Sequence, residues 1–222
     1  MAISETLKDL ERLASDSESV LVSYSGGKDS KVLLDLARRF FKNVACFYMY
    51  FVPNLKYDLT VVEYPKSLNI PIIQYPHPVF FTFLKNATYC NDAYGKLPTL
   101  TVLDVYAMVR QDTGYYHILH GAKKADSFWR RRQFGNTKGE KYRGLHYPLK
   151  EWNKLEVISY LKSKNIHIPE MSLLKQNATG IGLRTPELLY FYDNHRDDFN
   201  EICKYFPYAR SVIYRRDWYG IK

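Results

Sequence analysis

The stretch SGGKDS, residues 25–30, combines residue types that could bind a phosphate group. It follows the hydrophobic residues 20–24 and precedes a segment with helical spacing, so it lies where a strand gives way to a helix. The first turn of a helix presents unpaired backbone N–H groups and the positive end of the helix dipole, and both attract anions. Glycine lets the backbone approach an anion closely. The stretch therefore predicts a cradle for the phosphates of a nucleotide.

The side chains of this stretch suggest separate roles. The residues expected to bind the nucleotide are Ser25, Gly26, Gly27, Lys28, Asp29 and Ser30. The two serines can donate hydroxyl hydrogen bonds, and Lys28 supplies a mobile positive charge. The carboxylate of Asp29 cannot bind phosphate directly, so it could hold Mg²⁺ or orient the loop. The spacing is not that of a Walker A motif, which requires a glycine further upstream of the lysine.

A second cluster of polar residues follows another strand-like segment. Residues 121–131 read GAKKADSFWRR, and Gly121, Lys123, Ser127 and Arg130 are its candidate binding residues. If the segment is helical, Lys123 and Arg130 lie two turns apart on one side, with Ser127 between them. They could then grip terminal or ribose phosphates. The alternative is a helix face that simply meets solvent.

The basic stretch 128–144 is the third candidate. It interleaves lysines and arginines with Phe128, Trp129, Phe134 and Tyr142. Basic side chains contact a phosphate backbone, and aromatic rings stack on bases. The stretch therefore predicts a nucleic-acid interface, although a mobile loop that closes over the nucleotide would have the same composition.

Alternating hydrophobic segments show which elements position these residues. Short apolar runs alternate with segments in which apolar residues recur at helical spacing. We expect strands at residues 20–24, 44–51, 70–75 and 116–120, and helices at residues 4–15, 31–41, 55–68 and 99–112. Asn153 with Glu156 three residues on predicts a capped helix start. Thr185, as the cap, and Pro186 predict another.

This alternation predicts an α/β fold, a three-layer, Rossmann-like parallel sheet with helices on both faces. Ligands of such sheets lie beyond the carboxyl ends of the strands, near the point where strand order reverses. Residues 25–30 and the segment after His120 both follow strands, so both can face one site. We expect a nucleotide-binding core in residues 1–144 and a mainly helical extension packed on it in residues 145–222, because no Pro/Gly/Ser-rich linker divides them.

Composition limits the class of protein. Lysine and arginine number 32 against 23 aspartates and glutamates. This surplus indicates an anionic partner such as a nucleotide or nucleic acid, or only a solvated basic surface. The three cysteines form neither a CxxC pair nor a zinc-ligand spacing, which favours a reducing, cytoplasmic setting. No apolar run is long enough to span a membrane, and the first residues lack a signal-peptide pattern, so no membrane partner is expected.

Three motifs together resemble the ATP pyrophosphatase superfamily, the PP-loop adenine nucleotide α-hydrolases. SGGKDS is similar to their pyrophosphate loop. GAKKADSFWRR resembles the signature G-x-R-x-x-E-S-x-x-R of phosphoadenosine phosphosulfate (PAPS) reductases, with Lys123 for the arginine and Asp126 for the glutamate. Residues 147–161, YPLKEWNKLEVISYL, are similar to the PL-x-x-W-x-x-x-x-V-x-x-Y segment of that family. The three motifs occur in the family's order.

The resemblance implies an adenine nucleotide, ATP or PAPS, with Mg²⁺ tentatively on Asp29. It departs from the reductases because it lacks their C-terminal catalytic cysteine and the paired cysteines of an iron–sulfur cluster, so no cluster is expected. Adenylation of an acceptor, with pyrophosphate release and Lys28, Asp29 and Arg130 as catalytic residues, is then the expected activity. Cys90 could approach the site or be a buried structural thiol.

The partners implied are less specific. Without a catalytic cysteine, adenylation for sulfur transfer or nucleic-acid modification would need an external sulfur or nitrogen donor. Related short proteins of bacteriophages and DNA-modification systems make nucleic acid an acceptor by resemblance only. A homodimer, a PAPS or adenylyl-sulfate reductase with unconventional thiols, and a catalytically silent nucleotide- or DNA-binding module stay open at this stage.

Overall fold

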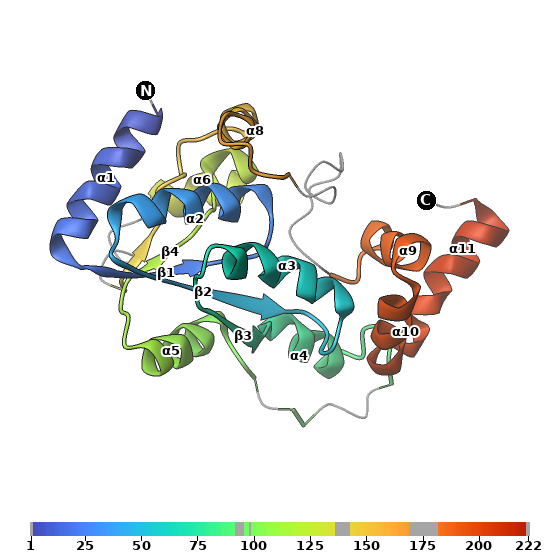
Figure 1. Cartoon of the computed structure of the whole chain (residues 1–222). Helices are drawn as coiled ribbons and strands as arrows, with labels where there is room; N and C mark the ends of the chain where they lie inside the picture. The colour runs from blue at the N-terminus through green and yellow to red at the C-terminus, as the bar shows by residue number, and fades with distance from the viewer. Residues whose placement is uncertain (1, 92–95, 98, 136–142, 169–181, 221–222) are drawn as a thin grey trace. The chain divides into compact units, whose positions relative to one another are not determined.

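A computed structural model describes residues 2–91, 96–97, 99–135, 143–168 and 182–220. The helices and strands, labelled in Figure 1, are α1 (Ala2–Asp16), β1 (Ser19–Ser23), α2 (Lys28–Phe40), β2 (Asn43–Tyr50), α3 (Lys56–Ser67), β3 (Ile72–Pro76), α4 (Pro78–Lys85), α5 (Val102–Thr113), β4 (Ile118–Leu119), η2 (Lys124–Asp126), α6 (Phe128–Gly135), β5 (Leu145–His146), α8 (Lys154–Ser163), α9 (Thr185–Asn194), α10 (Arg196–Tyr205), η4 (Pro207–Arg210) and α11 (Ser211–Tyr219). No helix in these ranges is long and apolar enough to cross a membrane.

The strands form one sheet in the order β3-β2-β1-β4-β5. β1 pairs in parallel with β2 on one side and with β4 on the other, and β4 pairs in parallel with β5. Val20, Leu21 and Val22 of β1 are fully buried, as expected for a central strand covered on both faces. Helix α2 lies on one side of the strands and α5 on the other (Figure 1). The predicted α/β fold with a parallel sheet is confirmed.

Strand order reverses at β1. The chain runs outward from β1 to β2 and β3, then returns to the other side of β1 for β4. The carboxyl ends of β1 and β4 therefore form a topological switch point, where open α/β sheets bind ligands. Residues 25–30 follow β1, and residues 120–123 follow β4.

Each expected strand and helix before residue 120 is present, but the fourth strand is shorter than expected. Only Ile118 and Leu119 of the run 116–120 form a strand, and both are fully buried. Tyr116 is exposed. Nδ1 of His117 lies 3.0 Å from Nε2 of His146, so this ring contacts a side chain of the neighbouring strand. Hydrophobicity alone does not distinguish such flanking aromatic residues from the strand itself.

The chain forms two compact units. The first unit comprises residues 1–48, 64–73 and 108–178, and the second unit comprises residues 49–63, 74–107 and 179–222. The expected division at residues 144 and 145 stays a prediction. All residues of the 25–30 loop and of the 121–130 segment belong to the first unit.

In the first unit, buried polar contacts join α1 to the segment before α8. The indole of Trp152 donates to Thr6 Oγ1 at 2.8 Å, and the Thr6 hydroxyl donates to the carbonyl of Pro148 at 2.8 Å. Both side chains are buried, so these hydrogen bonds satisfy groups that would be costly to leave unpaired. They fix the segment 148–152, the motif that resembles PL-x-x-W.

The two predicted helix starts differ in outcome. Asn153 Oδ1 accepts from the N–H groups of Leu155 and Glu156, and Glu156 accepts from the N–H of Asn153, so the capping box of α8 is confirmed. At α9, the prediction that Thr185 is the cap is wrong by one residue. Arg184 holds that position in extended conformation, and Thr185 is already helical. Pro186 lies in the first turn, where its missing N–H costs nothing.

The second unit has its own aromatic core. Its largest buried rings are Phe51, Phe80, Phe191, Phe199 and Phe206. Phe51 and Phe206 stack with ring centroids 6.1 Å apart.

Candidate functional site

The loop between β1 and α2 has the backbone geometry of an anion cradle. Gly26 adopts a left-handed conformation, with φ of +72°, which residues with a Cβ rarely adopt. Gly27 is the N-cap of α2, and within the described residues no side chain caps this helix end. The first helical hydrogen bond runs from the N–H of Lys31 to the carbonyl of Gly27, at 3.1 Å. The N–H groups of the first turn thus remain uncapped by side chains, as an anion site requires.

Ser25 and Ser30 hold the loop in shape. The Ser30 hydroxyl donates to the carbonyl of Gly27 at 2.9 Å, and the Ser25 hydroxyl lies 3.4 Å from that of Ser30. Ser30 is buried, whereas Ser25 is exposed. Of the two serines predicted to bind phosphate, Ser25 is therefore the one more open to a ligand.

Asp29 forms two ion pairs. One carboxylate oxygen accepts from Lys28 Nζ at 2.9 Å, and the other accepts from Lys123 Nζ at 2.6 Å. Lys28 comes from the β1–α2 loop and Lys123 from the segment after β4. The carboxylate thus joins the two strand exits at the switch point, as expected from the fold, and pairs with an ammonium group from each of them.

Lys123 is the most buried charged residue of this cluster, with 2% of its side chain exposed. Its ammonium also pairs with Asp126 at 3.0 Å, and its backbone N–H donates to the same carboxylate at 2.8 Å. Asp126 thereby closes the short turn η2. An ammonium held by two carboxylates in a buried position fits a structural clamp better than the predicted phosphate ligand.

Gly121 allows the two strand exits to approach each other. A Cβ placed on Gly121 would lie 3.3 Å from the Cβ and 3.4 Å from the carbonyl carbon of Asp29. These separations are tighter than ordinary contacts. A side chain at Gly121 would therefore press on the loop, whereas the binding of a nucleotide by Gly121 stays a prediction.

The prediction that Lys123 and Arg130 share one helix face is wrong. The segment is not one helix: η2 ends at Asp126, Ser127 is extended, and α6 begins at Phe128. The Ser127 hydroxyl accepts from the N–H of Arg130 at 3.1 Å, so Ser127 acts as a helix cap. Arg130 is exposed on α6, whereas Lys123 is buried. The prediction assumed one continuous helix from Lys123 to Arg130. It missed the break because it did not consider that Ser127, between them, could begin a new helix as its cap.

Aromatic packing anchors α6 beside the switch point. Phe134 is buried and meets the ring of Tyr147 edge-on, with ring centroids 4.9 Å apart. His120 stacks on the same tyrosine ring, with centroids 5.6 Å apart. Burial, together with the nearby charge of Arg130, lowers the pKa of His120 to about 4. The ring is therefore neutral at pH 7, which fits a packing role for this residue.

Asp29 as placed does not fit a resident Mg²⁺ ligand well. Both of its oxygens are already paired with ammonium groups, and a further cation beside them would be repelled. Across the described ranges, no group of three or more His, Cys, Asp or Glu side chains is arranged to hold a metal ion. The uncapped amino end of α2, with Lys28 beside it, does fit the phosphates of a nucleotide.

Lys31 is a residue that the sequence reasoning missed. It follows Ser30 directly and is buried. Its ammonium nitrogen donates to the carbonyl of His167 at 2.9 Å and lies 5.1 Å from the centre of the Tyr64 ring. Burial lowers its pKa. Its position next to the apolar run Val32–Leu34 could have revealed it, because helical spacing places this position on the inner face of α2.

The cysteines and His77 belong to packing. Cys46, Cys90 and Cys203 are all buried, and burial raises the pKa of each thiol. Cys90 lies in the core of the second unit, which is the structural alternative weighed for it. His77 Nδ1 accepts from the N–H of Val79 and so caps α4. Residues 136–142 of the basic stretch lie outside the described residues, as do residues 169–181.

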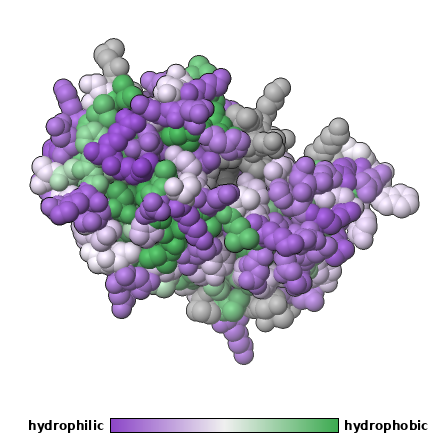
Figure 2. Space-filling model, viewed as in Figure 1, coloured by the Kyte–Doolittle hydropathy of each residue, from purple (hydrophilic) through white to green (hydrophobic). Residues whose placement is uncertain are grey.

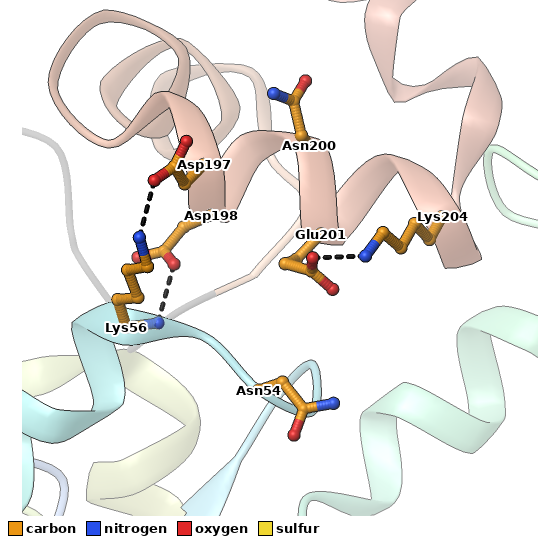
Figure 3. Close-up of a pocket in the computed structure, with 7 residues that line it drawn as sticks. All are labelled: Asn54, Lys56, Asp197, Asp198, Asn200, Glu201 and Lys204. Atoms are coloured by element: carbon orange, nitrogen blue, oxygen red, sulfur yellow. Dashed lines mark hydrogen bonds and ion pairs between the residues drawn. The ribbon is translucent and has the colours of Figure 1, made fainter.

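The second unit has a shallow pocket of about 450 Å³ between the start of α3 and helix α10. Figure 3 shows its polar lining. Asp198 accepts from the N–H groups of Lys56 and Tyr57 and so caps α3, while Asp197 pairs with Lys56 and Glu201 with Lys204. These contacts anchor two helices. The pocket contains none of the residues predicted for the nucleotide.

Comparison with known proteins places the chain in context. Residues 19–185 match the family model of the phosphoadenosine phosphosulfate reductase domain. No curated protein sequence matches the chain. Its fold is similar to that of the U34-tRNA thiolase NcsA from Methanococcus maripaludis, solved with its 4Fe–4S cluster, at a TM-score of 0.52 and 13% identity over 100% of this chain and 81% of that one. An NH3-dependent NAD synthetase from Campylobacter jejuni, in complex with nitrate, gives a TM-score of 0.49 and 14% identity over 100% of this chain and 95% of that one.

Proposed function

The chain belongs to the phosphoadenosine phosphosulfate reductase domain family, and from this premise we propose that it is an ATP pyrophosphatase. It would bind ATP at the amino end of α2 and adenylate an acceptor, with release of pyrophosphate. The observation that carries this proposal is the β1–α2 loop, where a left-handed Gly26 and an N-cap without a side-chain cap leave the first-turn N–H groups facing the switch point.

The residues of the β1–α2 loop and its partner Lys123 would have separate roles in this reaction. The N–H groups of the first turn of α2 would bind the β- and γ-phosphates, which form the leaving group, and the ammonium of Lys28 would offset the charge that develops on it. Asp29 and Lys123 would act as positioning residues, because their ion pair fixes where Lys28 lies. Any magnesium in this proposal accompanies the phosphates and is not assigned to Asp29.

The reaction follows from this arrangement. An acceptor oxygen attacks the α-phosphorus of ATP, the bond from that phosphorus to the bridging oxygen breaks, and pyrophosphate leaves with the bonding electrons. The acceptor loses its proton to solvent. The adenylated acceptor then exchanges AMP for an external nucleophile, such as a sulfur or nitrogen donor. In transfers of this type, positioning and electrostatic stabilisation supply most of the rate enhancement.

Burial of the cysteines favours adenylation over reduction. Reduction of PAPS by a protein thiol requires a thiolate that can attack sulfur. The sequence has three cysteines, and all three are buried with the pKa of the thiol raised. None of them combines the exposure and the lowered pKa that a nucleophilic thiol needs.

The acceptor is a finer part of the proposal. Helix α6 begins directly after the Lys123–Asp126 clamp and carries Arg130, Arg131 and Arg132, all exposed, beside the exposed ring of Phe128. An acceptor that brings phosphates and bases to this helix would suit these side chains. A nucleic-acid acceptor is therefore the version that the structure supports best, and the thiolase that resembles this chain in fold is a tRNA thiolase.

The proposal is tested by a pyrophosphate-release assay with ATP and, in turn, tRNA, DNA, sulfate and PAPS. We expect release with a nucleic-acid acceptor, loss of release in Lys28→Ala, and weakened acceptor dependence in Arg130→Ala. A variant with all three cysteines replaced by serine or alanine should keep its activity. ATP bound tightly with no pyrophosphate released from any acceptor would instead indicate a silent binding module, and sulfite release from PAPS that depends on a cysteine would indicate a reductase.

A further inference from the structure

The end of the second unit exposes several aromatic rings that its core does not use. Trp218 is 81% exposed, Tyr219 76%, Tyr214 60% and Tyr208 55%. Other rings of this unit, such as Phe191, Phe199 and Phe206, are buried in its core. Large rings left in water cost free energy unless a partner covers them.

Tyr214, Trp218 and Tyr219 lie on helix α11, and this helix cannot rotate to bury them. On α11, Val212 and Ile213 lie on the side opposite Tyr214 and Trp218 and are buried in the core of the second unit. Arg216 Nη1 lies 2.9 Å from both carboxylate oxygens of Asp193 on α9. These contacts fix the orientation of α11, so its aromatic face stays turned outward.

Arginines alternate with the rings on this face. Tyr214 and Trp218 are four residues apart and so neighbour each other along the helix, and the same spacing joins Arg210 to Tyr214 and Arg215 to Tyr219. Arg210 and Arg215 are exposed, and Arg210 also makes a side-chain hydrogen bond with Cys203. We call the set Tyr208, Arg210, Tyr214, Arg215, Trp218 and Tyr219 the C-terminal aromatic surface. It therefore offers flat rings and positive charge together.

This composition selects among partners. In Figure 2 the surface over α9 and α11 is pale and purple with little green, so the rings are surrounded by polar and charged side chains and not by an aliphatic patch. A twofold contact between two copies would bring the Arg210 and Arg215 side chains of both copies into one interface, in a chain of net charge +9. An anionic partner with flat faces avoids this repulsion.

We propose that the C-terminal aromatic surface binds single-stranded nucleic acid. Trp218 and Tyr214 stack on unpaired bases, and Arg210 and Arg215 contact the phosphates on either side. Aromatic rings interleaved with arginines are the means by which proteins hold single strands without reading their sequence. The surface lies in the second unit and does not depend on ATP, so it is a binding site beyond the proposed adenylation.

Fluorescence anisotropy of the full chain with a labelled oligothymidine of about 12 nucleotides tests the proposal. We expect binding at low salt that weakens as salt is raised. Trp218→Ala and Tyr214→Ala should each weaken binding by about tenfold, since one stacked base is lost. Leu155→Ala, which removes an exposed apolar side chain from α8, is the matched control and should change nothing. Lys162→Gln, an exposed cation on α8, is the control for Arg215→Gln.

Several results would overturn the proposal. These are the absence of binding at low salt, equal affinity of Trp218→Ala and the wild type, or equal affinity for a duplex of the same length. Loss of binding only in Arg131→Gln and Arg132→Gln would assign the strand to α6 alone. A wild-type dimer that Trp218→Ala dissociates in sedimentation would show that a second copy covers the surface. Pyrophosphate release, measured in parallel, keeps these outcomes separate from the proposed adenylation.

Discussion

Lys123 is the residue on which the geometry of the proposed nucleotide site depends most. It is buried and bonds Asp29 on one side and Asp126 on the other. Lys123→Met would remove the cation shared by the two carboxylates and leave Asp29 with Lys28 as its ion-pair partner, and we expect it to lower the free energy of unfolding by about 1–3 kcal/mol. It should also weaken ATP binding, because Asp29 would then repel the phosphates. Denaturant unfolding and calorimetric titration with ATP measure the two effects.

The matched variant is Lys123→Arg, which restores the arginine of the motif that this segment resembles. A guanidinium can keep both carboxylate contacts, so we expect Lys123→Arg to retain most of the stability and most of the ATP affinity. If Lys123→Met bound ATP as tightly as the wild type, the positioning role of this residue would be wrong. A loss of affinity equal in both variants would instead favour direct contact of the lysine with the nucleotide.

His120 predicts how stability depends on pH. Its pKa is lowered from 6.5 to about 4, mainly by burial and also by Arg130. Below pH 6.5 the unfolded chain takes up a proton that the folded ring refuses, so stability falls as pH drops from 6.5 toward 4. The loss between pH 7 and pH 5 is about 2 kcal/mol. His77 and His117, whose pKa values are also lowered, act in the same direction.

The measurement is urea unfolding of the wild type and His120→Phe at pH 7 and pH 5. The phenylalanine keeps a ring against Tyr147 but cannot take up a proton. We expect the variant to lose less stability on acidification than the wild type. Parallel loss in both proteins would mean that His120 is solvated well enough to titrate normally.

At the scale of elements, the contact between the exits of β1 and β4 shapes the site. Gly121→Ala would place a methyl group 3.3–3.5 Å from atoms of Asp29. The loop must shift by a few tenths of an ångström, and we expect ATP affinity to fall by about tenfold while overall stability changes little. Calorimetric titration gives the affinity. Gly182→Ala is the control, because its added methyl group meets no atom within 4 Å. An unchanged affinity in Gly121→Ala would show that the exits tolerate more separation than the structure indicates.

Elements defined by strong local signals were predicted well from the sequence. Apolar periodicity located the strands around β1 and the helix α2, and the Asn153 capping box located the start of α8. The break between η2 and α6 was missed, because the Ser127 cap and the Asp126 turn lie in a segment whose charges fit an unbroken helix equally well. Hydrogen bonds of local polar side chains determine where such a helix breaks, whereas hydrophobic periodicity gives no information about the position of the break.

For the whole molecule, parallel topology explains why the meeting of the two segments of the candidate site could be anticipated. Residues 25–30 and 121–123 are far apart in sequence, yet the pairing of β1 with β4 brings Asp29 within 2.6 Å of Lys123. The rule that ligands bind where strand order reverses predicted this meeting. The roles of the individual charges were not predictable, because whether a lysine faces a ligand or a carboxylate depends on packing. The outward aromatic face of α11 was likewise hidden, since rings in a helix usually indicate core.

The site lies wholly in the first unit, so nucleotide binding should stabilise that part of the molecule. A ligand present at about a hundred times its Kd adds about 2.7 kcal/mol. For a chain of this size, each 1 kcal/mol raises Tm by about 2–4 °C, so ATP should raise Tm by about 5–10 °C. Calorimetry with increasing ATP measures this rise, and where two transitions are resolved, that of the first unit should move. Lys28→Ala should need far more ATP for the same shift, whereas Lys154→Ala, an exposed cation on α8, should respond like the wild type. An equal shift in Lys28→Ala and the wild type would place the phosphates away from α2, since the N–H cradle and this ammonium act on the same charge.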